Sequence, residues 1–140
     1  MFVLDTNILS AIMSAHPAPR VAAWMSVQPA ELLFTTSISQ AEIFAGVAVL
    51  PEGRRRRDLA AAARAIFDED LAGHVLPFDA AAAIAYADIF AARRRAGWPI
   101  ATLDLMIAAI ARSHAATVVT RDSADFEGCG VTVVDPWTAA

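Results

Sequence analysis

The sequence predicts an α/β fold in which helices cover both faces of a parallel sheet of about five short strands. Three observations predict it. Short apolar runs alternate with long alanine-rich stretches along the whole chain. Two of the apolar runs lead directly into an aspartate, which is typical of a strand that ends at the ligand-binding edge of a sheet. No internal repeat and no linker long enough to divide the 140 residues is present, so a single domain over residues 1–140 is expected.

Each apolar run has the length of a strand rather than of a buried helix. The first is followed at once by Asp5, and the fourth by Asp122. A short apolar run that ends at a carboxylate is typical of a buried parallel strand. The predicted strands are Met1–Leu4, Leu32–Thr36, Val75–Phe78, Thr117–Arg121 and Val131–Val134.

The alanine-rich stretches between the strands are predicted helices, because alanine has the highest intrinsic helix propensity. Pro51–Gly53 and Gly97–Pro99 carry the turn residues that separate neighbouring helices. A further helical-looking stretch follows Asn7. The other predicted helices are Ser39–Leu50, Arg54–Ala72, Ala80–Ala96 and Leu103–His114.

The composition is unusually apolar for a chain with no membrane segment. Apolar residues make up 57% of it, against about 45–50% in an average soluble domain. The longest charge-free stretch, Thr6–Pro19, contains two prolines and is shorter than the ~20 residues that a membrane span needs. A secretory signal would begin with a basic residue, whereas the first charged side chain is Asp5. We therefore expect a cytoplasmic protein that buries its excess apolar surface against a second copy, as a homodimer.

Several enzyme classes are excluded by residues that the chain lacks. A single Cys129 rules out disulfides within one chain, and His16, His74 and His114 are too widely spaced for a zinc motif. Every base is an arginine, so neither a P-loop lysine nor the lysine of a receiver domain is available. No G-x-G-x-x-G motif for a dinucleotide occurs. A phosphatase of the haloacid dehalogenase type would need a second aspartate where Asn7 stands.

Asp5 and Asp122 are predicted to share one edge of the sheet, because the carboxyl ends of parallel strands lie together. Either of them could instead cap a helix or stabilise a turn. Asp79 and Asp135 also follow predicted strands, but a helix N-cap explains the first and an ordinary turn explains the second.

Two acids within predicted helices complete the acidic set. Glu42 has apolar neighbours, with Gly46 on the same helix face, and could also be an ordinary solvated residue. Asp104 interrupts an apolar stretch and either caps its helix or points into a polar pocket. Several carboxylates held together need protons or a cation, and ligands that are all oxygen select Mg²⁺ or Mn²⁺. Such an ion is the usual machinery for cleaving phosphodiesters, so a metal-dependent phosphodiesterase is one interpretation of the residues.

Two arginine runs lie at opposite ends of their predicted helices. Arg93–Arg95 closes a helix, where the macrodipole favours cations. Arg54–Arg57 opens one, which is the unfavourable end. The Arg54–Arg57 run is therefore either a solvated surface or a contact with nucleic-acid phosphates through Arg54, Arg55, Arg56 and Arg57.

Four stretches in order resemble the PIN-domain ribonucleases, and among them the VapC-type toxins of type II toxin–antitoxin pairs, closest to the FitB branch. The resemblance covers nearly the whole chain. Each motif is weak alone, whereas four at the right spacing are specific. The stretches are Phe2–Asn7, Ile38–Gly46, Pro99–Ala109 around Asp104, and Val119–Asp122 with Asp125 and Phe126.

The resemblance implies a three-layer α/β/α sandwich, Mg²⁺ or Mn²⁺ as cofactor, endonucleolytic cleavage of RNA and a homodimer. It also implies inhibition by a small antitoxin that carries a DNA-binding domain. A catalytically inactive PIN-like dimer that acts only as a partner in the antitoxin and DNA complex is the alternative, and the presence of all four acids argues against it. By position, the metal-binding and catalytic residues would be Asp5, Glu42, Asp104 and Asp122, with Asp125 outside them and with Thr6, Asn7 and Thr120 hydrogen-bonded to them.

Overall fold

The computed structural model describes residues 1–138 and arranges the strands in one parallel sheet of order β3-β2-β1-β4-β5. The first strand lies at the centre of the sheet. Its Val3 pairs with Phe34 on one side and with Val118 on the other. The strands are β1 (Phe2–Leu4), β2 (Leu33–Thr36), β3 (Val75–Leu76), β4 (Thr117–Val119) and β5 (Thr132–Val134).

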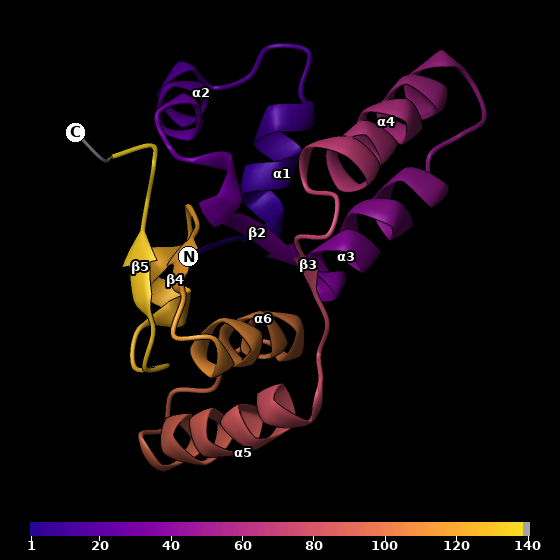
Figure 1. The fold of residues 1–140 in the computed structure, drawn as a ribbon. Coiled ribbons are helices and arrows are strands. Elements are labelled where there is room, and N and C mark those ends of the chain that lie inside the picture. The colour runs from indigo at the N-terminus through magenta and orange to yellow at the C-terminus, as the bar shows by residue number, and fades with distance from the viewer. Residues whose placement is uncertain (139–140) are drawn as a thin grey trace.

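Helices cover both faces of this sheet, as Figure 1 shows, with α5 and α6 on one side and α1 to α4 on the other. The helices are α1 (Thr6–Met13), α2 (Pro19–Ser26), α3 (Ser37–Ala48), α4 (Arg54–Ala65), α5 (Ala80–Arg95) and α6 (Thr102–Ser113). Three short helical turns connect them: η1 (Ala30–Leu32), η2 (Ile66–Asp70) and η3 (Ser123–Phe126).

The strands divide their side chains between two cores, because successive residues of a strand point to opposite faces. Val3 and Val118 pack with the apolar side chains of α5 and α6. Leu4 and Val119, the next residues along, pack in the core formed with α1, α3 and η2. The alternation fixes the orientation of the residue that follows each strand, and on β1 that residue is Asp5.

The predicted α/β/α sandwich with a parallel sheet of five short strands is confirmed, and several elements differ from the prediction. Helix α2 was not predicted, although Pro19 occupies its first turn, where proline is well tolerated. The helix predicted over Arg54–Ala72 ends at Ala65 and continues as the π-turn η2. Three acids, Asp68–Asp70, lie at that end, where the macrodipole disfavours negative charge. Strands β3 and β4 are each two residues shorter than predicted, so β4 ends at Val119 and Asp122 does not follow it directly.

Two predicted local roles of aspartates are present in the structure. The Asp79 carboxylate accepts a hydrogen bond from the Ala82 amide at 3.0 Å and so caps α5. The Asp135 carboxylate accepts one from the Trp137 amide at 2.8 Å and so stabilises a turn. Within residues 1–138, no helix is long and apolar enough to cross a membrane.

Candidate active site

Asp5 lies at the carboxyl end of the central strand and is only 4% exposed. One carboxylate oxygen accepts a hydrogen bond from the Thr6 amide at 2.8 Å, so the side chain caps α1. The other oxygen accepts a hydrogen bond from the Thr120 hydroxyl at 2.7 Å. Capping a helix and belonging to the site were alternatives for Asp5 in the sequence. The structure shows that they are compatible, because the two carboxylate oxygens have different partners.

Asn7 connects the end of β1 to the end of β4. Its Nδ2 donates to the Thr120 hydroxyl at 3.1 Å and to the Asp122 carboxylate at 3.1 Å. It also donates, at 3.4 Å, to the Asp5 oxygen that accepts from Thr120, and its Oδ1 accepts from the Arg121 amide at 3.2 Å. Asp122 does not cap η3 with its side chain, so its carboxylate is directed towards Asn7 instead.

Glu42 comes into the site from α3, the helix that follows β2. The Thr6 hydroxyl donates to Glu42 Oε1 at 2.8 Å and lies 3.0 Å from the Ser39 hydroxyl. Ser39 is itself fixed, because its amide donates to the Thr36 hydroxyl that caps α3. Ser39 was not among the residues predicted for the site. Its position three residues after the capping Thr36 is the pattern that could have indicated it.

Asp104 lies in the first turn of α6, whose N-cap is Ala101, so the capping alternative does not apply to it. Its pKa is raised from 3.8 to about 6. Burial is the largest cause, and the charges of neighbouring carboxylates add to it, namely those of Asp5, Asp125, Glu42 and Asp122. The structure thus brings Asp104 close enough to each of the other predicted site acids to feel its charge.

The pKa of Asp5 is raised as well. Burial raises it most, the hydrogen bonds from Thr120 and Thr6 lower it, and the charges of Glu42 and Asp122 raise it again. No arginine balances this group, since the one ion pair within residues 1–138 joins Arg54 to Asp58 at 3.7 Å. The result is a cluster of mutually repelling carboxylates, which protons or a cation would stabilise.

The donor set suits a hard divalent cation, because every side chain offered is an oxygen ligand. No three acids, histidines or cysteines among the described residues are yet spaced as ligands of a single ion. Like charges repel without a cation between them, so binding would have to draw the carboxylates together. Asp122 and Asp125 are both exposed, but only Asp122 accepts a hydrogen bond from Asn7.

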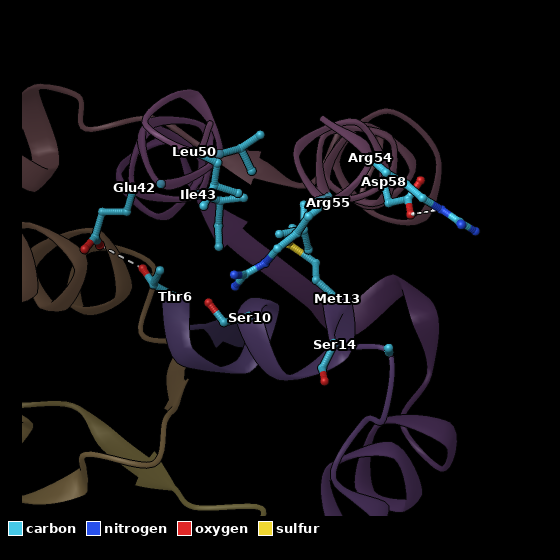
Figure 2. A pocket seen from close by; sticks show the side chains of 14 residues that line it. Thr6, Ser10, Met13, Ser14, Glu42, Ile43, Leu50, Arg54, Arg55 and Asp58 are labelled. Atoms are coloured by element: carbon cyan, nitrogen blue, oxygen red, sulfur yellow. Dashed lines mark hydrogen bonds and ion pairs between the residues drawn. The ribbon is translucent and has the colours of Figure 1, made fainter. Parts of the chain in front are cut away.

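A cleft of about 1060 Å³ adjoins the acidic cluster and runs between α1, α3 and α4. Thr6 and Glu42 line one end of it, as Figure 2 shows. The Arg55 side chain extends from α4 into the cleft towards Thr6, whereas Arg54 lies beside Asp58 and points away. Arg56 and Arg57 do not line the cleft, so the structure separates the members of the arginine run.

The chain belongs to the PIN domain family, which matches residues 2–128. Within that family it is 39% identical to the VapC ribonuclease Y4jK of Sinorhizobium fredii over 100% of both chains. It is 36% identical to the Toxin FitB of Neisseria gonorrhoeae over 98% of this chain and 99% of that one. The structure of FitAB bound to an IR36 DNA fragment superposes with a TM-score of 0.93 at 36% identity, covering 100% of this chain and 98% of that chain. The predicted relationship to VapC-type toxins and FitB is confirmed.

Proposed function

We propose that this chain is the toxin of a toxin–antitoxin pair and that it hydrolyses RNA phosphodiester bonds as a Mg²⁺- or Mn²⁺-dependent endoribonuclease. The observation that carries the proposal is the cluster of carboxylates at the carboxyl end of the sheet. The pKa of Asp104 in this cluster is raised to about 6, and within residues 1–138 no basic side chain forms an ion pair with a member. The PIN domain family and the relatives named VapC ribonuclease and Toxin FitB support the same activity.

The proposed ligands come from four segments of the chain, and hydrogen bonds orient three of them. Asp5, Glu42, Asp104 and Asp122 would hold the ion. When bound, Mg²⁺ or Mn²⁺ would activate water and stabilise the leaving oxygen of the phosphodiester. The Thr120 hydroxyl and the Thr6 amide orient Asp5, and the Thr6 hydroxyl orients Glu42. Asn7 fixes Asp122 relative to Asp5, as outer hydrogen-bonding partners do for metal ligands.

The RNA is proposed to approach along the cleft beside Glu42. Arg55 points into this cleft, where its guanidinium can pair with a phosphate of the substrate. Arg54 already pairs with Asp58 and contributes less. Arg56 and Arg57 lie outside the cleft lining and would contact phosphates only at its rim.

The proposed assembly is a homodimer that also binds a small antitoxin with a DNA-binding domain. Large apolar side chains remain exposed on α5, on the loop after it and at the start of α6, namely Ile84, Phe90, Trp98 and Leu103. Burying them against a second copy would remove this surface from water. Light scattering of the purified chain should give about twice its mass of 14.8 kDa. The antitoxin is proposed because the similar FitAB structure is bound to a DNA fragment. A cytoplasmic location is proposed because the proposed substrate is RNA.

Cleavage of a defined RNA by the purified chain tests the activity, with Mn²⁺ or EDTA present. Asp5→Asn should remove cleavage, because it removes a central ligand without changing the shape of the side chain. Asp88→Asn is the matched control, since Asp88 is exposed on α5 and outside the proposed ligand set. Full activity in EDTA, or equal activity of the Asp5→Asn variant, would refute the proposed metal-dependent mechanism. A dimer that binds its antitoxin and DNA but cleaves no RNA would support the inactive alternative.

A further inference from the structure

Arg93 is buried, in contrast to its two neighbours in the same arginine run. Its side chain is 4% exposed, whereas Arg94 and Arg95 are exposed at the end of α5. The macrodipole accounts for a cation at a helix C-terminus, but it does not account for burying one. Taking a guanidinium out of water is costly unless hydrogen bonds replace the lost water. The partners of Arg93 therefore show what its burial achieves.

Those partners are backbone carbonyls from two separate segments. Nε donates to the Trp98 carbonyl at 2.6 Å, just beyond the end of α5. Nη1 donates to the Asp125 carbonyl at 3.3 Å and to the Glu127 carbonyl, and it lies 3.6 Å from Cys129 Sγ. No carboxylate within residues 1–138 pairs with this guanidinium. Its positive charge is thus satisfied by main-chain carbonyls, and the acidic side chains of the proposed site remain available for a cation.

The first segment is fixed to Arg93 in three ways. Trp98 donates its amide to the Arg93 carbonyl at 2.9 Å, and its carbonyl accepts from the Arg93 side chain. The guanidinium also stacks over the Trp98 ring at 4.4 Å from its centroid. The hydrogen bond from the Trp98 amide belongs to a Schellman turn, in which Gly97 has a positive φ of 69°. This segment leads directly into α6, where Asp104 lies in the first turn.

The second segment carries the late acids of the proposed site. It begins at Asp122, which Asn7 holds, and it contains Asp125, whose carbonyl Arg93 binds. Arg93 therefore ties the segment before Asp104 to the segment after Asp122.

We infer that Arg93 is a positioning residue of the active site, which sets the spacing of Asp104 relative to Asp122 by cross-linking the backbones that carry them. The inference rests on the proposed function for its effect on catalysis. Arginine suits the role because its planar fork presents five donors, enough for carbonyls that come from different directions. Lysine keeps the charge but offers no rigid fork, so it should restore the cross-link only in part.

Hydrogen exchange tests the cross-link without any activity measurement. Arg93→Met keeps the length of the aliphatic chain and removes all donors, while Arg95→Met removes a charge at the same helix end and serves as the matched control. In Arg93→Met, amides of residues 98–104 and 122–129 should both lose protection, with the central strands unchanged. Arg93→Lys should give an intermediate loss, and Arg95→Met none. Protection lost at one segment only, or equally in the Arg95→Met control, would refute the cross-link.

Mn²⁺ binding, followed by titration calorimetry on the same proteins, tests the effect on the site. Arg93→Met should weaken Mn²⁺ binding about 10–100-fold, the loss typical of removing an outer partner of a metal ligand. The rate of RNA cleavage at saturating RNA should fall, while the KM for RNA should stay close to that of the wild type. If Arg93→Met is less stable but binds Mn²⁺ and cleaves RNA like the wild type, Arg93 is structural only. If Arg93→Met does not fold, Arg93→Lys carries the same tests. A wild type that binds no Mn²⁺ and cleaves no RNA would refute the proposed function, and the exchange data would still decide the cross-link.

Discussion

Asp5 and Asp122, at the ends of two neighbouring strands, are held by hydrogen bonds to Thr6, Asn7 and Thr120. Asp104 lies in the first turn of a helix, and its side chain makes no hydrogen bond within residues 1–138, although its pKa is raised to about 6. Glu42 is intermediate, with one hydrogen bond from Thr6. The same cluster therefore has a strand half that is fixed and a helix half that is held mainly by packing. The strand half is therefore oriented by hydrogen bonds before any cation binds, whereas Asp104 has no hydrogen bond among the described residues to give up on binding one.

The largest expected effect is on RNA cleavage, where both halves should be indispensable. Asp5→Asn and Asp104→Asn each remove a proposed ligand, so each should lower the rate by more than the roughly 100-fold lost with an outer hydrogen-bonding partner. Rates measured with excess Mn²⁺ check this expectation. The control Asp88→Asn should cleave like the wild type. A variant of one half that retained activity would show that this half does not hold the ion.

Asn7 should separate the halves, because it bonds only within the strand half. Asn7→Ala removes the donor shared by Asp122 and Thr120 and should lower cleavage by about 10–100-fold. Thr6→Val removes the hydroxyl that orients Glu42 and tests the helix half in the same assay. Equal rates for Asn7→Ala and the wild type would show that the hydrogen bonds of Asn7 do not position the ligands.

Metal-free stability should depend on pH through the helix half. The pKa of Asp104 is raised from 3.8 to about 6, so the folded chain binds this proton more tightly than the unfolded chain does. Its contribution to stability is therefore fully present below pH 3.8 and is lost as the pH rises through 6. The free energy of unfolding in urea should therefore fall more for the wild type than for Asp104→Asn between pH 4 and pH 7. An equal change in the free energy of unfolding with pH in the two proteins would contradict the raised pKa of Asp104.

Metal should reverse this penalty in the wild type. Mg²⁺ or Mn²⁺ binds the folded chain and not the unfolded one, so it should raise the melting temperature at pH 7. The increase should be smaller for Asp104→Asn, in which one charged ligand is missing. Differential scanning fluorimetry with and without Mn²⁺ measures both. An identical increase in the two proteins would indicate that the cation binds elsewhere.

The smallest expected effect concerns the arginine run beside the helix half. Arg55→Gln should flatten the salt dependence of RNA binding by about 0.7 units of slope, the value for one phosphate contact on a single strand. Arg54→Gln should change it less, because Arg54 already pairs with Asp58. Filter binding at several salt concentrations gives the slopes. Equal slopes for Arg55→Gln and the wild type would show that Arg55 contacts no phosphate and is an ordinary solvated residue.

Sequence alone determined the features that depend on local pattern. The apolar runs and the residues after them located the strands and placed Asp5 and Asp122 at one sheet edge. Propensity located most helices and the cap at Asp79, because these depend on residues within a few positions of one another. Four acids in the right order also indicated the family, which the match to residues 2–128 confirmed.

Tertiary structure decided how those residues are connected. The bonds of Asn7 to Thr120 and Asp122 join residues more than a hundred positions apart, and they exist because β1 and β4 pair in one register. The macrodipole explains a cation at the end of α5, but not the burial of Arg93. The nearby Trp98 carbonyl and the distant Asp125 carbonyl converge on its side chain and make that burial favourable. Periodicity and propensity report which face or end of an element a residue occupies. They carry no information on which distant groups face it, and those groups set the geometry of this site.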